Sequence, residues 1–192
     1  MSEAPLIPRP ARRRSGEEPV AGAYLADFWR WAYSDLLGNT GRGVFAEWIV
    51  GRALGCVDGV REGWANHDLE WDAIRIEVKS AAYLQAWQTR TPSRIVFGGL
   101  RARAWDPVTG EWAAVQTYRA DVYVFCILTA TDHDRIDPLD TNQWQFWVVG
   151  QEAVSATGLR SIGLALVQRL AGDPVLFAGL PGAVRRATGR TG

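Results

Sequence analysis

Two short runs of strand-forming residues, 68–71 and 74–80, are separated by only two residues, and this spacing constrains the fold more than any other feature of the sequence. A two-residue connection between such runs is typical of a tight β-hairpin. In the second run apolar and charged residues alternate, so Ile74, Ile76 and Val78 are expected on one face of the strand. We therefore expect an antiparallel pair of strands with one buried face.

The expected turn at residues 72 and 73 also fixes which residues face each other across the hairpin. Asp68 and Glu77 fall opposite one another, with Cβ atoms about 5 Å apart. Two carboxylates so placed repel unless a proton or a cation lies between them. A hard cation such as Mg²⁺ would remove the conflict, since it prefers carboxylate oxygens and accepts phosphate as a further ligand. The other expected pairs are Trp71 with Ile74, Glu70 with Arg75, and Leu69 with Ile76.

Lys79 lies two residues beyond Glu77, on the same face of the strand, and is the only lysine among 21 basic residues. The other twenty are arginines. A lysine kept in such a chain suggests a need for a compact ammonium group. Codon bias is the alternative explanation.

The rest of the chain predicts an α/β fold, with a central mixed β-sheet flanked by helices. The helix expected at residues 41–54 is apolar around most of its circumference except at Glu47, so this carboxylate should be buried. Further helices are expected at residues 23–37, near 81–88 and at 161–170. Further strands are expected at residues 94–100, 121–129 and 143–149.

Length and composition predict one folded domain. The chain has 192 residues, 47% of them apolar, and equal numbers of acidic and basic side chains. We expect a mobile basic, proline-rich arm at residues 1–19, a single domain at residues 20–181 and a flexible basic tail at residues 182–192. The absence of a long apolar run argues against a membrane span, and the N-terminus does not resemble a secretory signal, so the expected location is the cytoplasm.

Two carboxylates and an ammonium on one hairpin suit phosphodiester hydrolysis. Asp68 followed by Glu77-Val78-Lys79 at the end of a strand resembles the PD-(D/E)XK nuclease superfamily. The resemblance implies a restriction-endonuclease-like fold and a Mg²⁺-dependent endonuclease that cuts DNA, with Mn²⁺ able to substitute and with restriction or phage defence as its setting. It also implies that Asp68, Glu77 and the main chain of Val78 are metal ligands, with Glu47 as a further acid, and that Lys79 positions the attacking water.

Residues after the motif are candidates for nucleic-acid contacts. Gln85 is expected to face the site, Trp87 to stack on bases, and Arg90 and Arg94 to contact phosphates. Arg101 and Arg103 extend this basic stripe, and Trp105 and Trp112 are further stacking candidates. Because one small domain leaves little room for sequence readout, we expect a homodimer or a partner protein to supply specificity.

Two other interpretations of the same residues stay open. The chain could be a catalytically inactive nuclease-like module that holds nucleic acid or assembles with a protein. Alternatively, the hairpin could be purely structural, with a Glu70–Arg75 pair and its other charges in water. Asp72 also competes with Asp68 for the role of first acidic residue, although we expect Asp72 in the turn.

Overall fold

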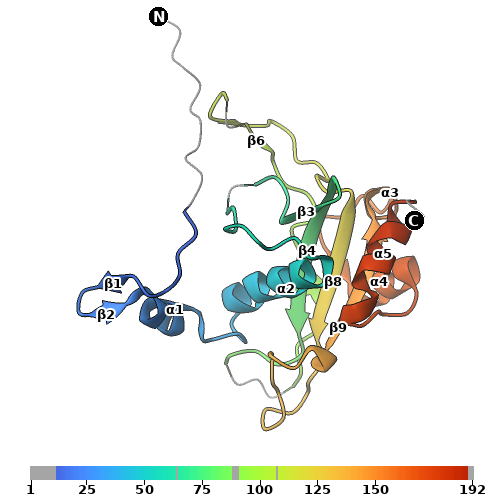
Figure 1. The fold of residues 1–192 in the computed structure, drawn as a ribbon. Helices are drawn as coiled ribbons and strands as arrows, with labels where there is room; N and C mark the ends of the chain where they lie inside the picture. The colour runs from blue at the N-terminus through green and yellow to red at the C-terminus, as the bar shows by residue number, and fades with distance from the viewer. Residues whose placement is uncertain (1–11, 64, 88–90, 107, 190–192) are drawn as a thin grey trace, which may run out of the picture.

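The computed structural model describes residues 12–63, 65–87, 91–106 and 108–189, and its centre is a four-stranded mixed sheet. The sheet strands are β3 (Leu69–Trp71), β4 (Ile74–Ala82), β8 (Val122–Leu128) and β9 (Trp144–Gly150). They lie side by side in the order β3-β4-β8-β9 (Figure 1). Only the β4–β8 pair is parallel. The predicted central mixed sheet flanked by helices is confirmed.

Helices and short strand pairs complete the fold. The helices are α1 (Leu25–Tyr33), α2 (Asn39–Leu54), α3 (Gln151–Ala156), α4 (Leu164–Ala171) and α5 (Leu180–Ala187), with 3₁₀ turns η1 (Thr141–Gln143) and η2 (Phe177–Gly179). The short strands are β1 (Pro19–Val20), β2 (Ala23–Tyr24), β5 (Val96–Phe97), β6 (Trp105–Asp106), β7 (Glu111–Trp112) and β10 (Ile162–Gly163). None of the described helices is long and apolar enough to cross a membrane.

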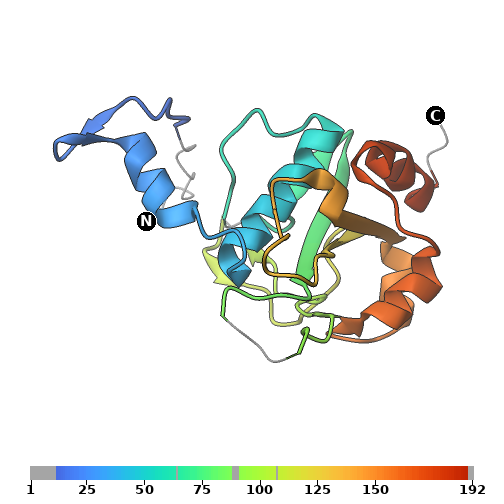
Figure 2. The ribbon, with the colours of Figure 1, turned by 90° about the horizontal axis from the view of Figure 1, so that it is seen from below.

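The sheet is covered on both faces, and β8 is buried along its whole length. Alternate side chains of β4, β8 and β9 pack against α2 and α5, where Ile49, Val50 and Val184 are buried. The opposite face packs against α3, α4 and residues 95–100. Figure 2 shows α2 on one side of the sheet and the α3–α4 region on another. A strand that is buried on both faces of a sheet typically has a nearly continuous apolar sequence, and β8 has such a sequence.

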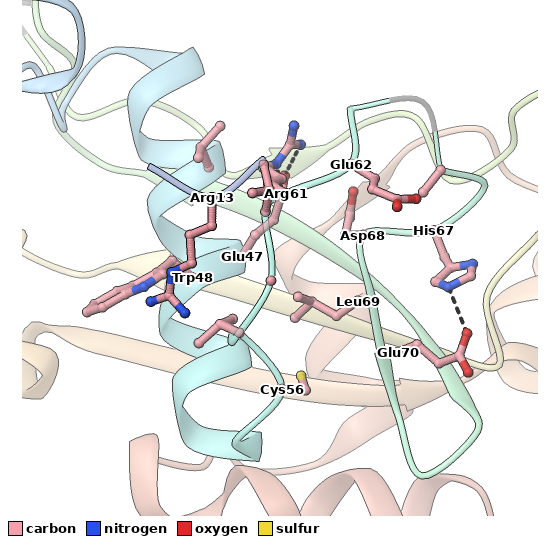
Figure 3. Close-up of a pocket in the computed structure, with 15 residues that line it drawn as sticks. Arg13, Glu47, Trp48, Cys56, Arg61, Glu62, His67, Asp68, Leu69 and Glu70 are labelled. Atoms are coloured by element: carbon pink, nitrogen blue, oxygen red, sulfur yellow. Dashed lines mark hydrogen bonds and ion pairs between the residues drawn. The ribbon is translucent and has the colours of Figure 1, made fainter. Parts of the chain in front are cut away.

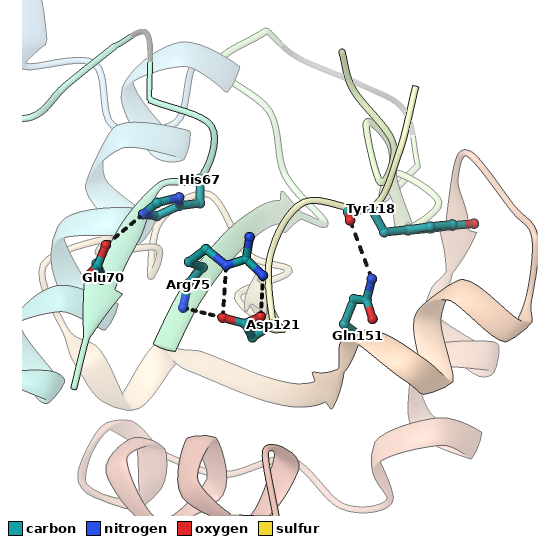
Figure 4. A network of polar contacts seen from close by, with 6 residues as sticks. All are labelled: His67, Glu70, Arg75, Tyr118, Asp121 and Gln151. Carbon is teal, nitrogen blue, oxygen red and sulfur yellow. Dashed lines mark hydrogen bonds and ion pairs between the residues drawn. The ribbon is translucent and has the colours of Figure 1, made fainter. Parts of the chain in front are cut away.

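Arg75 and Asp121 fix the register where β4 and β8 begin. The Arg75 backbone N–H and guanidinium donate to the Asp121 carboxylate, and the Asp121 N–H donates to the Arg75 carbonyl (Figure 4). Glu70 faces Arg75 across the hairpin but lies 3.5 Å from His67 Nε2 instead. The proposed structural Glu70–Arg75 pair is therefore replaced by the Arg75–Asp121 ion pair, which joins the beginnings of β4 and β8.

The prediction of a helix near residues 81–88 is wrong for residues 81–87, which the structure describes. Ala81 and Ala82 continue β4 and pair with Ile127 and Leu128 of β8, and residues 83–87 form bends. Strand pairing along β8 outweighs the helical propensity of the alanines.

The other predicted elements are present, with three shifted boundaries. The strand predicted at 94–100 is reduced to β5, since Gly99 has a φ of +68° and cannot continue an extended strand. The helix predicted at 161–170 begins at Leu164, because Ile162 and Gly163 pair with β5. The helix predicted at 23–37 is limited to α1, and the Asp35 carboxylate accepts the N–H groups of Leu37 and Gly38 in the turn that follows.

The predicted flexible tail from residue 182 is wrong over most of its length, because α5 runs to Ala187. Its apolar side chains Leu180, Ala183 and Val184 are buried against the sheet and α2. The folded part of the chain therefore extends at least six residues beyond the predicted boundary at 181.

Residues 12–19 of the predicted N-terminal arm belong to the described chain, and Arg9 lies outside it. Arg13 donates to the Asp58 carbonyl, and the Leu25 N–H donates to the Glu18 carbonyl. β1, β2 and α1 stand beside the sheet rather than over it (Figures 1 and 2).

We predict that Leu180→Ala destabilises the protein by about 2–5 kcal/mol, because it opens a cavity where α5 meets the sheet. Leu176→Ala, at an exposed position just before α5, should change the free energy of unfolding by less than about 0.5 kcal/mol. Urea denaturation followed by circular dichroism measures both. Equal effects of the two substitutions would mean that α5 does not contribute to the core.

Candidate active site

The hairpin turn follows the predicted geometry. Asp72 and Ala73 both have positive φ angles, 49° and 58°, as a two-residue type I′ turn requires. The pairs Trp71 with Ile74, Glu70 with Arg75 and Leu69 with Ile76 are confirmed. Asp72 lies in the turn as expected, at the far end of the hairpin from Asp68.

Asp68 directly precedes β3, at the point where the chain enters the sheet. Its N–H donates to the Ile76 carbonyl at 3.0 Å, and its carboxylate Oδ2 accepts the Val78 N–H at 2.7 Å. The carboxylate thus takes the place of the next backbone acceptor of β3. The pairing predicted for Asp68 and Glu77 is corrected accordingly, because β3 begins at Leu69, one residue after Asp68.

Glu77 and Lys79 lie on the sheet face opposite α2, since they alternate with Ile76 and Val78, which pack against that helix. The Lys79 ammonium lies 2.6 Å from Glu77 Oε1. Both side chains are largely covered, with 20% and 10% of their surface exposed. Tyr123, the β8 partner of Glu77, has its pKa raised to about 12 by burial and by the charge of Glu77.

Glu47 reaches the hairpin from α2, with 12% of its side chain exposed. Arg61 holds this carboxylate with two hydrogen bonds, one of them 2.8 Å from Nη2 to Oε1. Glu47, Arg61 and Asp68 line one cavity of about 540 Å³ between α2, residues 56–62 and the start of β3 (Figure 3). Glu47 is mostly covered rather than buried as expected, and its charge is balanced by an arginine that the sequence pattern does not indicate.

The electrostatic effects of these carboxylates converge on Asp68. Burial, together with the negative charges of Glu77 and then Glu47, raises the pKa of Asp68 to about 7. The Val78 N–H and the Lys79 ammonium act in the opposite direction. Asp68 therefore has a carboxyl group that is only partly ionised near neutral pH unless another cation comes close.

Few groups on the β3 side of β4 could bind a divalent cation. No group of three or more His, Cys, Asp or Glu side chains is arranged for metal binding within the described residues. Asp68 and Glu77 supply two carboxylates, and β4 has no strand partner on the β3 side beyond Ile76, which leaves the Val78 carbonyl on an open edge. Carboxylate and carbonyl oxygens are the ligands that Mg²⁺ prefers, and this ion keeps several water ligands. Of these three residues only Asp68 lines the cavity that contains Glu47.

The predicted nucleic-acid contacts are spread over different environments. Gln85 is buried, donates to the Ala82 carbonyl and the Ser93 hydroxyl, and accepts from Arg42 Nη1, so the structure gives it a packing role. Trp87 and Arg94 are exposed and stay candidates. Arg90 lies outside the described residues.

Sequence reasoning missed the cations that line the cavity. Arg61 and Arg13 enter from segments without a recognisable motif, and Arg13 is held there by the Asp58 carbonyl. His67, next to Asp68, also lines the cavity, and its buried Nδ1 has no hydrogen-bond partner among the described residues. Only the tertiary fold brings Arg61 and Arg13 to the cavity of Asp68, so no local pattern could have found these two residues.

We predict that Asp68→Asn stabilises the metal-free protein at neutral pH, because it removes a buried charge while its amide oxygen still accepts the Val78 N–H. The folded pKa of about 7 exceeds the unfolded value of about 4, so Asp68 costs the wild type stability as pH rises from about 4 to about 7. The advantage of the variant should grow across this window, reach on the order of 4 kcal/mol and then level off.

Denaturation in EDTA at a series of pH values measures this difference. Asp173→Asn, at an exposed aspartate, is the control and should show no such trend. A variant that is less stable than the wild type at pH 8 would contradict the raised pKa of Asp68.

Comparison with protein-family models, with curated proteins and with solved structures gave no match for this chain. The functional assignment below therefore depends on the residues and geometry of the hairpin site.

Proposed function

We propose that this chain is a metal-dependent nuclease that hydrolyses phosphodiester bonds in DNA, on a fold of the restriction-endonuclease type. The observation that carries the proposal is the negative charge that acts on the buried Asp68 carboxylate from Glu77 and Glu47. The Asp68 carboxylate is fixed 2.7 Å from the Val78 N–H, and its pKa is raised by burial and by Glu77 and Glu47. Proteins keep such unfavourable arrangements of charge mainly at functional sites.

The donor set suggests how the residues divide the work. Asp68, Glu77 and the Val78 carbonyl would hold a Mg²⁺ ion, with Mn²⁺ as a substitute. When bound, this ion would polarise the phosphate and lower the pKa of a water molecule. Glu47 lines the same cavity as Asp68 and is a supporting acid, which Arg61 holds in place.

Lys79 is suited to orient the attacking water and to offset the charge that develops on the phosphate. Its ammonium is already aligned by the 2.6 Å contact with Glu77 Oε1. Gly99 lies close to the ammonium, since a Cβ atom built on this glycine would lie 3.5 Å from the Lys79 Nζ. A compact ammonium fits this position better than a planar guanidinium.

A catalytically inactive nuclease-like module is the second candidate. It is favoured by the two ion pairs, Arg61 with Glu47 and Lys79 with Glu77, which neutralise two of the three carboxylates without any metal. Such a module would bind nucleic acid or a partner protein without cutting. A cleavage assay distinguishes the two candidates directly.

We predict that the purified chain nicks or cuts DNA in the presence of Mg²⁺ or Mn²⁺, and that EDTA stops the reaction. Asp68→Asn and Glu77→Gln should each lower the cleavage rate by about 10²-fold or more, since each removes a metal ligand. Asp173→Asn should cut normally. Gel analysis of supercoiled plasmid and of end-labelled single strands provides the readout, and cutting that survives both ligand substitutions would assign Asp68 and Glu77 to structure.

We further predict that Lys79→Arg loses about 10²-fold or more in cleavage rate, close to the loss in Lys79→Ala. The larger, planar guanidinium would displace the water that the ammonium orients. Rates at saturating Mg²⁺ measure the effect, with circular dichroism showing that the fold is intact. Near-normal activity in the arginine variant would mean that Lys79 supplies only positive charge.

A further inference from the structure

A second cavity, of about 440 Å³, has three arginines in its lining and lies apart from the hairpin carboxylates. Arg101 and Arg103 come from the segment before β6, and Arg119 comes from the segment before β8. These two segments lie side by side, because Ala102 and Thr117 exchange backbone hydrogen bonds of 3.1 and 3.0 Å. Trp112 of β7 also lines the cavity, with 49% of its surface exposed.

The charge of this cavity is not balanced by nearby acids. No aspartate or glutamate lines it, and none of the three arginines forms an ion pair with a carboxylate in the part of the chain that the structure describes. Three guanidinium groups lining one cavity repel one another unless an anion lies between them. The cavity therefore favours a negatively charged ligand.

Two of the guanidinium groups are held in place by neutral acceptors. Arg101 Nη2 donates to the Gln116 carbonyl at 3.0 Å, and the Arg101 guanidinium lies over the Tyr118 ring. Arg119 Nη1 donates to Asn66 Oδ1 at 2.9 Å and to the Arg103 carbonyl at 3.1 Å. Arg101 Nε is buried without a hydrogen-bond partner among the described residues. The arginines are thus oriented before any ligand binds, and they keep donors for one.

The cavity is connected to the candidate active site through the segment before β3. Ala65 lines both cavities, and Asn66 forms two hydrogen bonds with the backbone of Trp105. His67 and Asp68 follow directly. β6 and the start of β3 lie at the same end of the sheet in Figure 1. A chain that passes over Asp68 can therefore continue into the arginine-lined cavity.

We propose that this cavity is a subsite for a single-stranded stretch of the nucleic acid next to the bond that is cut. Arg101, Arg103 and Arg119 hold backbone phosphates, and the half-exposed ring of Trp112 stacks on an unpaired base. The inference rests on the proposed nuclease function and adds to it the position and strand state of the substrate. An acidic protein segment shares the charge but does not use the exposed indole, so nucleic acid is the better fit.

Binding of a fluorescein-labelled single-stranded oligonucleotide, measured by fluorescence anisotropy in EDTA, tests the subsite without any cleavage. The variant Arg103→Gln/Arg119→Gln should bind about tenfold more weakly or worse, and the slope of log affinity against log salt should fall by about 0.7 for each lost phosphate contact. The matched control Arg135→Gln/Arg169→Gln removes the same charge from exposed positions elsewhere and should bind like the wild type. Arg103→Glu, at an exposed position, is a second variant that avoids the Arg119–Asn66 contact.

Two further measurements test base stacking on Trp112 and the preference for nucleic acid over an acidic protein segment. Trp112→Ala should weaken single-strand binding about fivefold or more, and Trp112→Phe should restore much of it. Polyglutamate of the same charge should compete poorly with the oligonucleotide.

Equal losses in the two arginine double variants would overturn the subsite, and so would effective competition by polyglutamate. Binding that depends on these arginines in a protein that never cuts DNA would leave the subsite in place and contradict the nuclease proposal alone.

Discussion

The hydrogen bond from the Val78 N–H to the Asp68 carboxylate is the contact on which the candidate site depends. It forms because β3 begins only at Leu69, whereas β4 continues for six residues beyond Ile76, the partner of Leu69. The Val78 N–H therefore donates to a side chain instead of to the backbone of β3. This arrangement holds a carboxylate at a sheet edge, within electrostatic reach of Glu77 and Glu47. The late start of β3 thus creates both the opening for a cation and the repulsion that a cation would relieve.

The rest of the fold keeps this edge in place from three sides. The Arg75–Asp121 pair fixes β4 against β8, and α2 carries Glu47 to the hairpin on one face of the sheet. On the other face Tyr123, which donates to the Leu100 carbonyl, lies beside Glu77 and ties β8 to residues 95–100. The basic cavity is built on the same end of the sheet through Asn66. The cavity with Asp68 and the basic cavity share Ala65, and this arrangement suits the proposed substrate, whose phosphates would need both a cation and basic side chains.

The parts of the structure that depend on local pattern could be predicted from the sequence, and the parts that depend on distant partners could not. The hairpin register follows from a two-residue turn and an alternating strand, and it was predicted correctly up to Leu69 and Ile76. Ala81 and Ala82 favour a helix locally, but pairing with β8 makes them a strand. The burial of α5 depends on the groove beside α2, which the short segment Leu180–Ala187 does not reveal. Arg61 and Arg119 likewise acquire their roles only through contacts across the fold, with Glu47 and with Asn66.

Anomalous diffraction from crystals soaked in Mn²⁺ tests the central claim most directly, because it locates a bound cation independently of any cleavage activity. The account predicts a Mn²⁺ peak in contact with the carboxylates of Asp68 and Glu77, at the open edge of β4, and its loss in the Asp68→Asn variant. A crystal in which this edge is open to solvent and Mn²⁺ binds only elsewhere, with Lys79 still paired to Glu77, would contradict it.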